Sequence, residues 1–268
     1  MLKTGAVSHL EQARAKSTFR LGDYIDEGYN IWKKEAGSFI GIFLVSIVIS
    51  LGLSLIPLLG ALASSLFVSP CLTLGIFLAT RTIDVDHHHF QFGDFFSGFD
   101  FISKVIVLNL IIFGIGFLLV LPFIIYGATS IAGLVEFDST DPSTFPFEIF
   151  TGGLLLFLIP IIYLSLLISY TIPMLGFYNL EPWEALKQSA KFIHKHWIMF
   201  FLFVLVIGLI ALLGIFALIF GVIVTASMMN PMMYASFKDV TDLDTYLNPT
   251  DEDDTVIGLG GITLDDFR

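Results

Sequence analysis

The side chains with the greatest potential for metal chemistry stand in one short run. Residues 84–89 read Asp-Val-Asp-His-His-His, and Asp94 follows closely. Carboxylates and imidazoles bind transition metals, but three successive imidazoles on regular structure cannot point at one ion. Helical metal sites use ligands three or four residues apart, a spacing that His194 and His196 also lack. We therefore expect a solvated loop at 84–89, no metal site and no cofactor.

Two further patterns could support catalysis or nucleotide binding, but each lacks required partners. Ser189, Lys191 and His194 share one predicted helix, yet no glycine elbow or loop that could form an oxyanion hole surrounds the serine. The glycines within 258–261 precede neither a helix nor a lysine, so they do not form a phosphate-binding loop. Nucleic-acid binding has no basic patch on which to rest. These patterns predict a protein that is not an enzyme and has no nucleic-acid partner.

The ionisable residues are excluded from four long runs of the chain. No Asp, Glu, Lys or Arg occurs in 36–80, 105–135, 149–180 or 196–237. Over the whole chain 56% of residues are hydrophobic and 14% are charged, against about 25% charged in an average globular protein. This composition excludes a water-soluble globular domain. It also disfavours ion-coupled transport, because such transporters carry ionisable groups at membrane depth.

The lengths of these runs predict six transmembrane helices. A bilayer core about 30 Å thick is crossed by about 20 helical residues. The first and last runs, of 45 and 42 residues, are each long enough for two spans, whereas each middle run holds one. The predicted fold class is therefore an all-α polytopic membrane protein with six transmembrane helices in three hairpins. Its spans are expected near 38–58, 61–80, 104–127, 152–175, 197–213 and 216–237.

The basic residues indicate the orientation of these spans. With both ends on one side, all 13 Lys and Arg lie on that side, and the opposite side receives an external loop, 128–150, with four acids. Because cytoplasmic flanks carry the excess of basic residues, we expect a bacterial inner-membrane protein with both termini cytoplasmic. The polar segment 1–20 lacks the apolar core of a signal peptide. It precedes a membrane domain, 21–240, and an acidic tail, 241–268, that is predicted to be disordered.

An amphipathic segment precedes each predicted hairpin. Within 182–197, aromatic and aliphatic residues recur at helical spacing, and lysines form a second stripe. Such a helix lies in the membrane plane, with aromatics at headgroup depth and lysines reaching anionic lipid. Similar stripes precede the first span and the third span, where Phe92, Phe95 and Phe99 lead to Lys104. The predicted lipid-interface residues are Trp32, Lys33, Lys34, Lys104, Trp183, Lys187, Lys191, Lys195 and Trp197.

The return helix of each hairpin contains a proline, and the spacing suggests an internal repeat. Pro70 and Pro231 each follow the preceding interfacial lysine by 36 residues, and Pro173 follows Lys104 by 69 because the external loop intervenes. This pattern predicts three related units in a pseudo-threefold arrangement. Proline removes a helical hydrogen bond and kinks the helix, so three kinks could outline a cavity open to the cytoplasmic side. Its expected wall includes Tyr163, Ser169, Tyr170, Asn230 or Tyr234.

The pattern resembles a family of uncharacterised bacterial six-span membrane proteins, similar to the membrane domain of some glycerophosphodiester phosphodiesterases. The residues that carry the resemblance are 158–162 (Leu-Ile-Pro-Ile-Ile), Pro173, 181–189 (Glu-Pro-Trp-Glu-Ala-Leu-Lys-Gln-Ser), Pro231 and Tyr234. The resemblance implies the six-span fold over about residues 20 to 240. It implies no activity, and no catalytic residue can be transferred from it.

Two functions are compatible with these observations. The first is a non-enzymatic accessory or scaffold subunit of a membrane complex, or an envelope-maintenance factor. Its expected partners are anionic lipid and other membrane proteins, the latter reached through the tail 241–268. The alternative is a transporter or channel for a lipid or a small neutral solute, which would use the cavity outlined by the three prolines.

Overall fold

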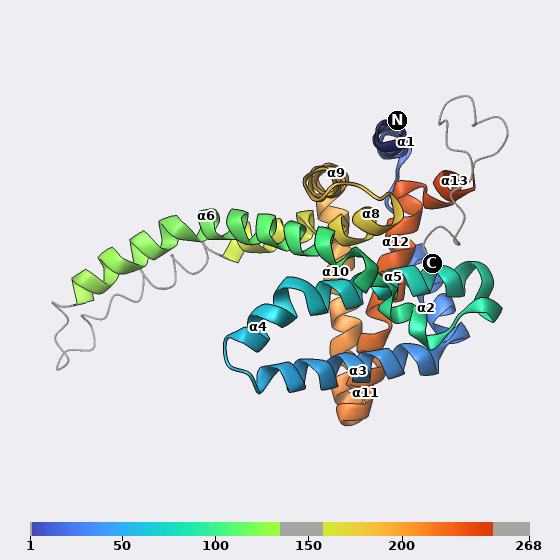
Figure 1. Cartoon of the computed structure of the whole chain (residues 1–268), viewed down its shortest axis with the longest axis horizontal. Helices are drawn as coiled ribbons and strands as arrows, with labels where there is room; N and C mark the ends of the chain where they lie inside the picture. The colour runs from blue at the N-terminus through green and yellow to red at the C-terminus, as the bar shows by residue number, and fades with distance from the viewer. Residues whose placement is uncertain (1, 135–157, 249–268) are drawn as a thin grey trace.

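A computed structural model describes residues 2–134 and 158–248 of the chain (Figure 1). The described residues are mostly helical and contain no strand. The N-terminal part contains α1 (Leu2–Lys16), α2 (Leu21–Lys34), α3 (Ala36–Ser54), α4 (Leu59–Ala63), the π-helical turn η1 (Ser64–Val68) and α5 (Ser69–Asp86). The middle part contains the 3₁₀ segments η2 (His87–His89) and η3 (Phe92–Phe101), followed by α6 (Ile102–Leu134). The last described part begins with a helical stretch at 158–167. It continues with α8 (Thr171–Phe177), α9 (Pro182–Lys195), α10 (Trp197–Leu213), η5 (Gly214–Ala217), α11 (Leu218–Ser227), α12 (Met229–Thr241) and α13 (Leu243–Leu247).

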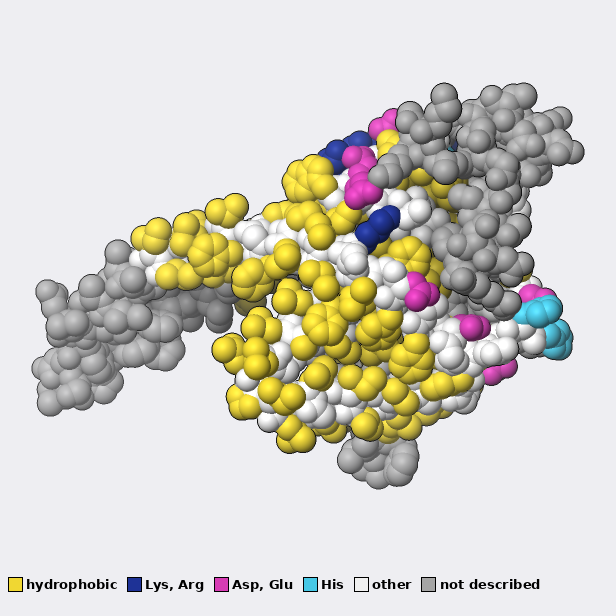
Figure 2. Space-filling view, in the orientation of Figure 1, with side chains coloured by type: hydrophobic (Ala, Val, Ile, Leu, Met, Phe, Trp, Pro, Cys, Tyr) yellow, Lys and Arg dark blue, Asp and Glu magenta, His cyan; other side chains and the backbone are white. Residues whose placement is uncertain are grey.

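Four helical stretches are long and apolar enough to cross a membrane: Ala36–Ser54, Leu59–Asp86, Phe92–Pro122 and Leu158–Phe177. Their outer surfaces are apolar, since Val48 on α3 and Leu118 on α6 are 67% and 68% exposed. Figure 2 shows hydrophobic side chains covering this face, with charged side chains gathered toward the top and right of the view. Water would penalise so much exposed hydrocarbon, whereas lipid does not. The chain therefore has the character of a helical membrane protein.

α10 has the bounds predicted for the fifth span, whereas the predicted sixth span is broken into shorter helices. With 17 residues, α10 alone is shorter than the four candidate spans. Only α9 and α10 together are long and apolar enough to cross a membrane, and the two helices are bent by 93°. The stretch 216–237 is divided between α11, of 10 residues, and α12. The described structure thus contains four candidate spans, or five with the bent pair, and six separate spans remain a prediction. The fourth predicted span begins at 152, and the external loop extends to 150, so both lie partly outside the described residues.

The apolar helices extend away from a common base. α3 leads to α4 and returns through α5 on the left of Figure 1, α6 projects farther in the same direction, and α10 and α11 run downward. α10 and α11 pack side by side across the turn η5. The base contains α2, η3, α8, α9 and α12, together with the start of α5. It therefore collects segments from along the whole chain.

Each predicted interfacial segment packs in this base against a helix that begins with one of the three prolines. α2 packs on α12, η3 packs on α5 and α9 packs on α8. The crossing points carry small residues. A Cβ atom on Gly28 would lie 2.4 Å from the backbone of Met232, and one on Gly98 would lie 2.0 Å from the carbonyl oxygen of Cys71. Only glycine permits backbones to approach this closely.

The first and last described helices pack on the base. The polar segment 1–20 contains α1, which buries Ala6, Leu10 and Ala13 and packs against α9 and α12. These positions recur at helical spacing and so form one face of the helix. The beginning of the predicted disordered tail forms α13, in which Leu243 and Tyr246 are buried. Residues 249–268 lie outside the described residues.

Candidate functional site

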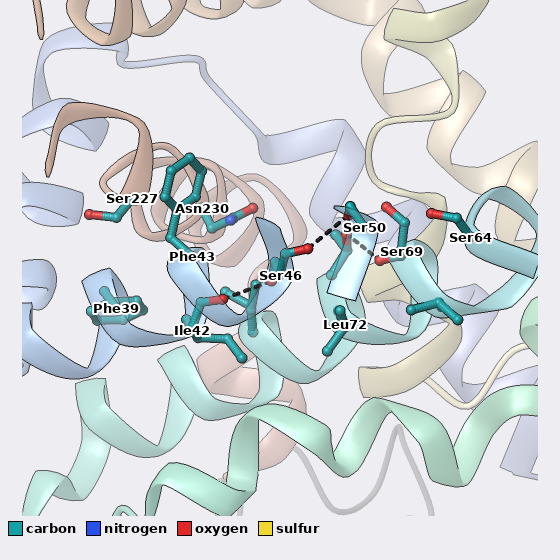
Figure 3. A pocket seen from close by; sticks show the side chains of 13 residues that line it. Phe39, Ile42, Phe43, Ser46, Ser50, Ser64, Ser69, Leu72, Ser227 and Asn230 are labelled. Atoms are coloured by element: carbon teal, nitrogen blue, oxygen red, sulfur yellow. Dashed lines mark hydrogen bonds between the residues drawn. The ribbon is translucent and has the colours of Figure 1, made fainter. Parts of the chain in front are cut away.

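A hydroxyl-lined pocket lies between α3, the start of α5 and the junction of α11 with α12. Its volume is about 160 Å³. Apolar walls come from residues such as Phe39 and Leu72. The polar side chains that line it are Ser46, Ser50, Ser64, Ser69, Thr73, Ser227 and Asn230 (Figure 3). Hydroxyl and amide groups from three separate parts of the chain therefore converge on one cavity.

Helical spacing explains why these groups share a cavity. Ser46 and Ser50 are four residues apart on α3, and Ser69 and Thr73 are four residues apart on α5, so each pair occupies one face of its helix. The third wall comes from Ser227, the last residue of α11, and Asn230, near the start of α12. Tertiary packing then turns the three faces toward one another.

Several of these hydroxyls already donate their proton to their own helix. Ser46 Oγ donates to the Ile42 carbonyl oxygen over 2.8 Å, and Thr73 Oγ1 donates to the Ser69 carbonyl oxygen over 2.9 Å. Ser50 Oγ likewise donates to the Ser46 carbonyl oxygen. A hydroxyl that has donated its proton retains acceptor lone pairs. The pocket therefore presents mainly hydrogen-bond acceptors.

The helix breaks before Pro70 and Pro231 explain why the pocket walls are irregular. Pro70 is the second residue of α5, directly after the π-helical turn, and Pro231 is the third residue of α12, directly after a break at Met228. Pro173 holds the same place in α8, after a break at 168–170. A proline in the first helical turn sacrifices no helical hydrogen bond. The breaks before Pro70 and Pro231 border the pocket, whereas the break before Pro173 contributes no lining residue.

Of the five residues expected to line a cavity, only Asn230 lines this pocket. Tyr170 and Tyr234 are buried in the aromatic core, where Tyr170 packs edge-on against Phe200. Tyr163 Oη lies 2.6 Å from His194 Nδ1, and Ser169 donates to its own helix. The serines of α3 and α5 were missed by the sequence analysis, although their spacing of four residues is a detectable signal.

The predicted lipid-interface lysines are engaged by the protein itself. Lys34 Nζ donates to the carbonyl oxygens of Ile83 and Asp84 near the end of α5. Lys104 donates to Asn179, just beyond α8. Lys195 donates to carbonyl oxygens at the end of α1, including that of Ser17 at 3.0 Å. Each lysine therefore satisfies carbonyls that a helix end leaves without partners.

The remaining predicted interface residues except Trp32 are exposed. Trp183 and Trp197 are 53% and 46% exposed. Lys187 pairs with Glu184, Lys191 Nζ lies 3.4 Å from Glu11, and Lys33 Nζ lies 4.6 Å from the centre of the Tyr29 ring. Trp32 differs from the other two tryptophans, because its indole N–H donates to Ser227 Oγ over 3.0 Å. It therefore lies directly behind the pocket wall.

A layer of paired charges connects the helices of the base. Lys238 contacts Glu27 and donates to Asp84 Oδ2 over 2.8 Å. Arg81, 3% exposed, contacts Asp244 and donates to Tyr234 Oη. Burial acts to lower the pKa of Lys238, but its hydrogen bonds to Asp84 and Glu27 outweigh burial and raise that pKa. These pairs connect α2, α5, α12 and α13.

The residues first considered for metal chemistry form no ligand set. His89 Nδ1 contacts Asp86 over 2.6 Å at the protein surface. Within 2–134 and 158–248, no group of three or more His, Cys, Asp or Glu side chains is positioned to hold a metal ion.

No family model, curated protein or solved structure matches this chain.

Proposed function

We propose that the chain is a six-span protein of the bacterial inner membrane that acts without catalysis, as an accessory or scaffold subunit of a membrane complex or in envelope maintenance. In this proposal α2, η3 and α9 lie in the plane of the cytoplasmic leaflet, and both termini are cytoplasmic. The 93° bend between α9 and α10 supports it, because a helix in the membrane plane must turn through about a right angle to enter the bilayer.

A pseudo-threefold repeat is part of the same proposal. A small residue stands six positions before each interfacial lysine: Gly28 before Lys34, Gly98 before Lys104 and Ser189 before Lys195. Gly28 and Gly98 each meet the first turn of a proline-bearing helix. Ser189 Oγ accepts from the Tyr170 amide just before α8, the third such helix. This cyclic contact pattern supports three related units that interlock into one base.

The observation that carries the scaffold proposal is the exposed surface of α6. Phe113 and Phe117 are 66% and 54% exposed, and a Cβ atom on Gly114 or Gly116 would meet nothing within 4 Å. Small residues beside large apolar ones let a second transmembrane helix approach closely. We therefore assign α6 as the contact surface for a partner helix.

Photocrosslinking in native membranes tests this assignment. A photoreactive residue at Phe117 is expected to give a discrete protein adduct that is lost when Gly114→Leu blocks close approach. Gly208→Leu on α10 is the matched control, because Gly208 also has open space around it and its replacement should leave the adduct intact. Adducts with lipid alone at Phe117 would contradict the scaffold proposal.

The pocket favours a second candidate function, the binding or transport of a lipid or a small neutral solute. Its polar side chains lie among apolar helices and include Asn230, which is one of the five residues predicted from the sequence to line a cavity. Polar groups at this depth more often bond to neighbouring helices. A binding function therefore requires that these groups also reach a ligand.

A further inference from the structure

Three features of the pocket restrict what it could bind: its charge, its hydrogen-bonding character and its position. None of the residues that line it is Asp, Glu, Lys, Arg or His. A phosphate or an ammonium group in the pocket would be a buried charge without a counter-ion, which is strongly unfavourable. The ligand must therefore be uncharged.

The hydrogen-bonding character favours a ligand that carries hydroxyl groups. Ser46, Ser50 and Thr73 have donated their protons to their own helices, so they can only accept from a ligand. Asn230 adds an amide that can both donate and accept. A group with two or three hydroxyls can donate to the serines and accept from Asn230. A volume of about 160 Å³ suits a group of that size and is too small for a typical drug-sized ligand.

The position of the pocket places such a group well inside the bilayer. Thr73 precedes Arg81 by eight residues and Asn230 precedes Lys238 by eight. At about 1.5 Å per residue, each lies about 12 Å from the charged layer. The bilayer core is about 30 Å thick. A ligand in the pocket would therefore sit part of the way across the membrane.

The mouth of the pocket faces hydrocarbon rather than water. Ser50 and Ser69 are its exposed members. On the same helix as Ser50, Ile47 and Leu51 are 38% and 62% exposed. A free polyol would have to cross apolar surroundings to reach this mouth, whereas a lipid could lay its acyl chain along these side chains. The surroundings therefore favour a lipid over a dissolved polyol.

We propose that the pocket binds the uncharged, hydroxylated headgroup of a lipid, with the acyl chain lying along the exposed face of α3. Monoacylglycerol is a suitable probe, because it is uncharged and has two free hydroxyls. This inference deepens the second candidate function, on whose pocket it rests. It does not depend on the scaffold role of α6.

Trp32 provides a local reporter for binding. The chain has three tryptophans, so the double variant Trp183→Phe, Trp197→Phe leaves only Trp32, which donates to the pocket residue Ser227. Titration of this purified protein in detergent with monoacylglycerol should give a saturable change in emission. Adding Ser46→Ala, Thr73→Val and Asn230→Leu should weaken binding about tenfold or more, since each lost hydrogen bond is worth roughly two- to tenfold.

The matched control is the double variant Ser165→Ala, Ser169→Ala. These serines also donate to their own helix, but they do not line the pocket, so affinity should be unchanged. The assignment is overturned if the three pocket substitutions leave affinity intact. Equal responses to free glycerol would overturn the lipid assignment, and equal responses to the anionic lipid phosphatidylglycerol would overturn the requirement for an uncharged headgroup.

A second measurement does not depend on the folding of the pocket variants. Monoacylglycerol brominated near its headgroup should quench Trp32 more strongly than the same lipid brominated near its chain end, and the reverse order would contradict the proposal. Redistribution of labelled lipid between the leaflets of vesicles separates binding from transport. Binding without redistribution would remove the transport function and leave the site.

Discussion

Lys238 is the residue on which the paired charges converge. Its side chain is 14% exposed and lies between Asp84 and Glu27, which are 17% and 36% exposed. Such a cation neutralises two partly buried carboxylates, and its removal breaks the ion pair of Glu27 and leaves Asp84 with Lys34, whose Nζ lies 4.0 Å from Asp84 Oδ1. The three groups come from α12, α5 and α2. They therefore hold the base together at one point.

We predict that Lys238→Met lowers the free energy of unfolding in detergent by about 1–3 kcal/mol. Lys187→Met is the control, because the Lys187–Glu184 pair lies at the surface and its loss should cost less than about 1 kcal/mol. Thermal unfolding of both variants measures the difference. Equal effects of the two substitutions would show that Lys238 has no special role.

The raised pKa of Lys238 adds a pH dependence with a definite sign. A base whose pKa is higher in the folded state contributes stability that is fully present below its ordinary value of 10.5 and is lost as pH rises through the folded pKa. Burial raises the pKa of the Tyr246 hydroxyl in the same direction. The melting temperature should therefore be flat from pH 8 to about 10 and fall above it. The fall should be shallower in Lys238→Met.

At the scale of elements, close helix crossings position the interfacial segments. Gly28 has no room for a Cβ atom against Met232, whereas Gly22, on the same helix, has open space around it. We predict that Gly28→Ala lowers the free energy of unfolding by about 1–3 kcal/mol, because α12 must be displaced. Gly22→Ala should change it by less than about 1 kcal/mol. Thermal unfolding in detergent of the two variants tests the crossing, and equal stabilities would argue against it.

The interfacial segments also show where helical periodicity is insufficient. The spacing of Phe92, Phe95 and Phe99 predicted an amphipathic α-helix, but η3 is a 3₁₀ segment. Its Gly98 packs against the backbone of Cys71 and Gly75. The close approach to α5 depends on a partner far away in sequence, and local periodicity does not report it.

At the scale of the whole molecule, the orientation of the chain is the prediction that remains to be measured. In a Cys71→Ala background, which removes the single cysteine, a new cysteine at Ser139 in the predicted external loop should react with an impermeant maleimide in intact cells. A cysteine at Ser8 on α1, which is exposed, should react only after permeabilisation. The opposite pattern would reverse the orientation and place the charged layer outside.

The sequence by itself determined that the protein is helical and belongs in a membrane, because long runs without charge can be stable in only one environment. It also located α2 and α9, and the bounds of α10 agree with the predicted fifth span.

Tertiary structure decided the partners of the lysines and the convergence of the serines on one pocket. Lys34, Lys104 and Lys195 donate to carbonyl oxygens at helix ends that folding brings near, and their contact with lipid stays a prediction. Ser46, Thr73 and Asn230 each follow local helical spacing, but only the packing of α3, α5 and α12 places them around one cavity. Periodicity fixes the face of a helix on which a residue lies, whereas the neighbour of that face depends on contacts distant in sequence.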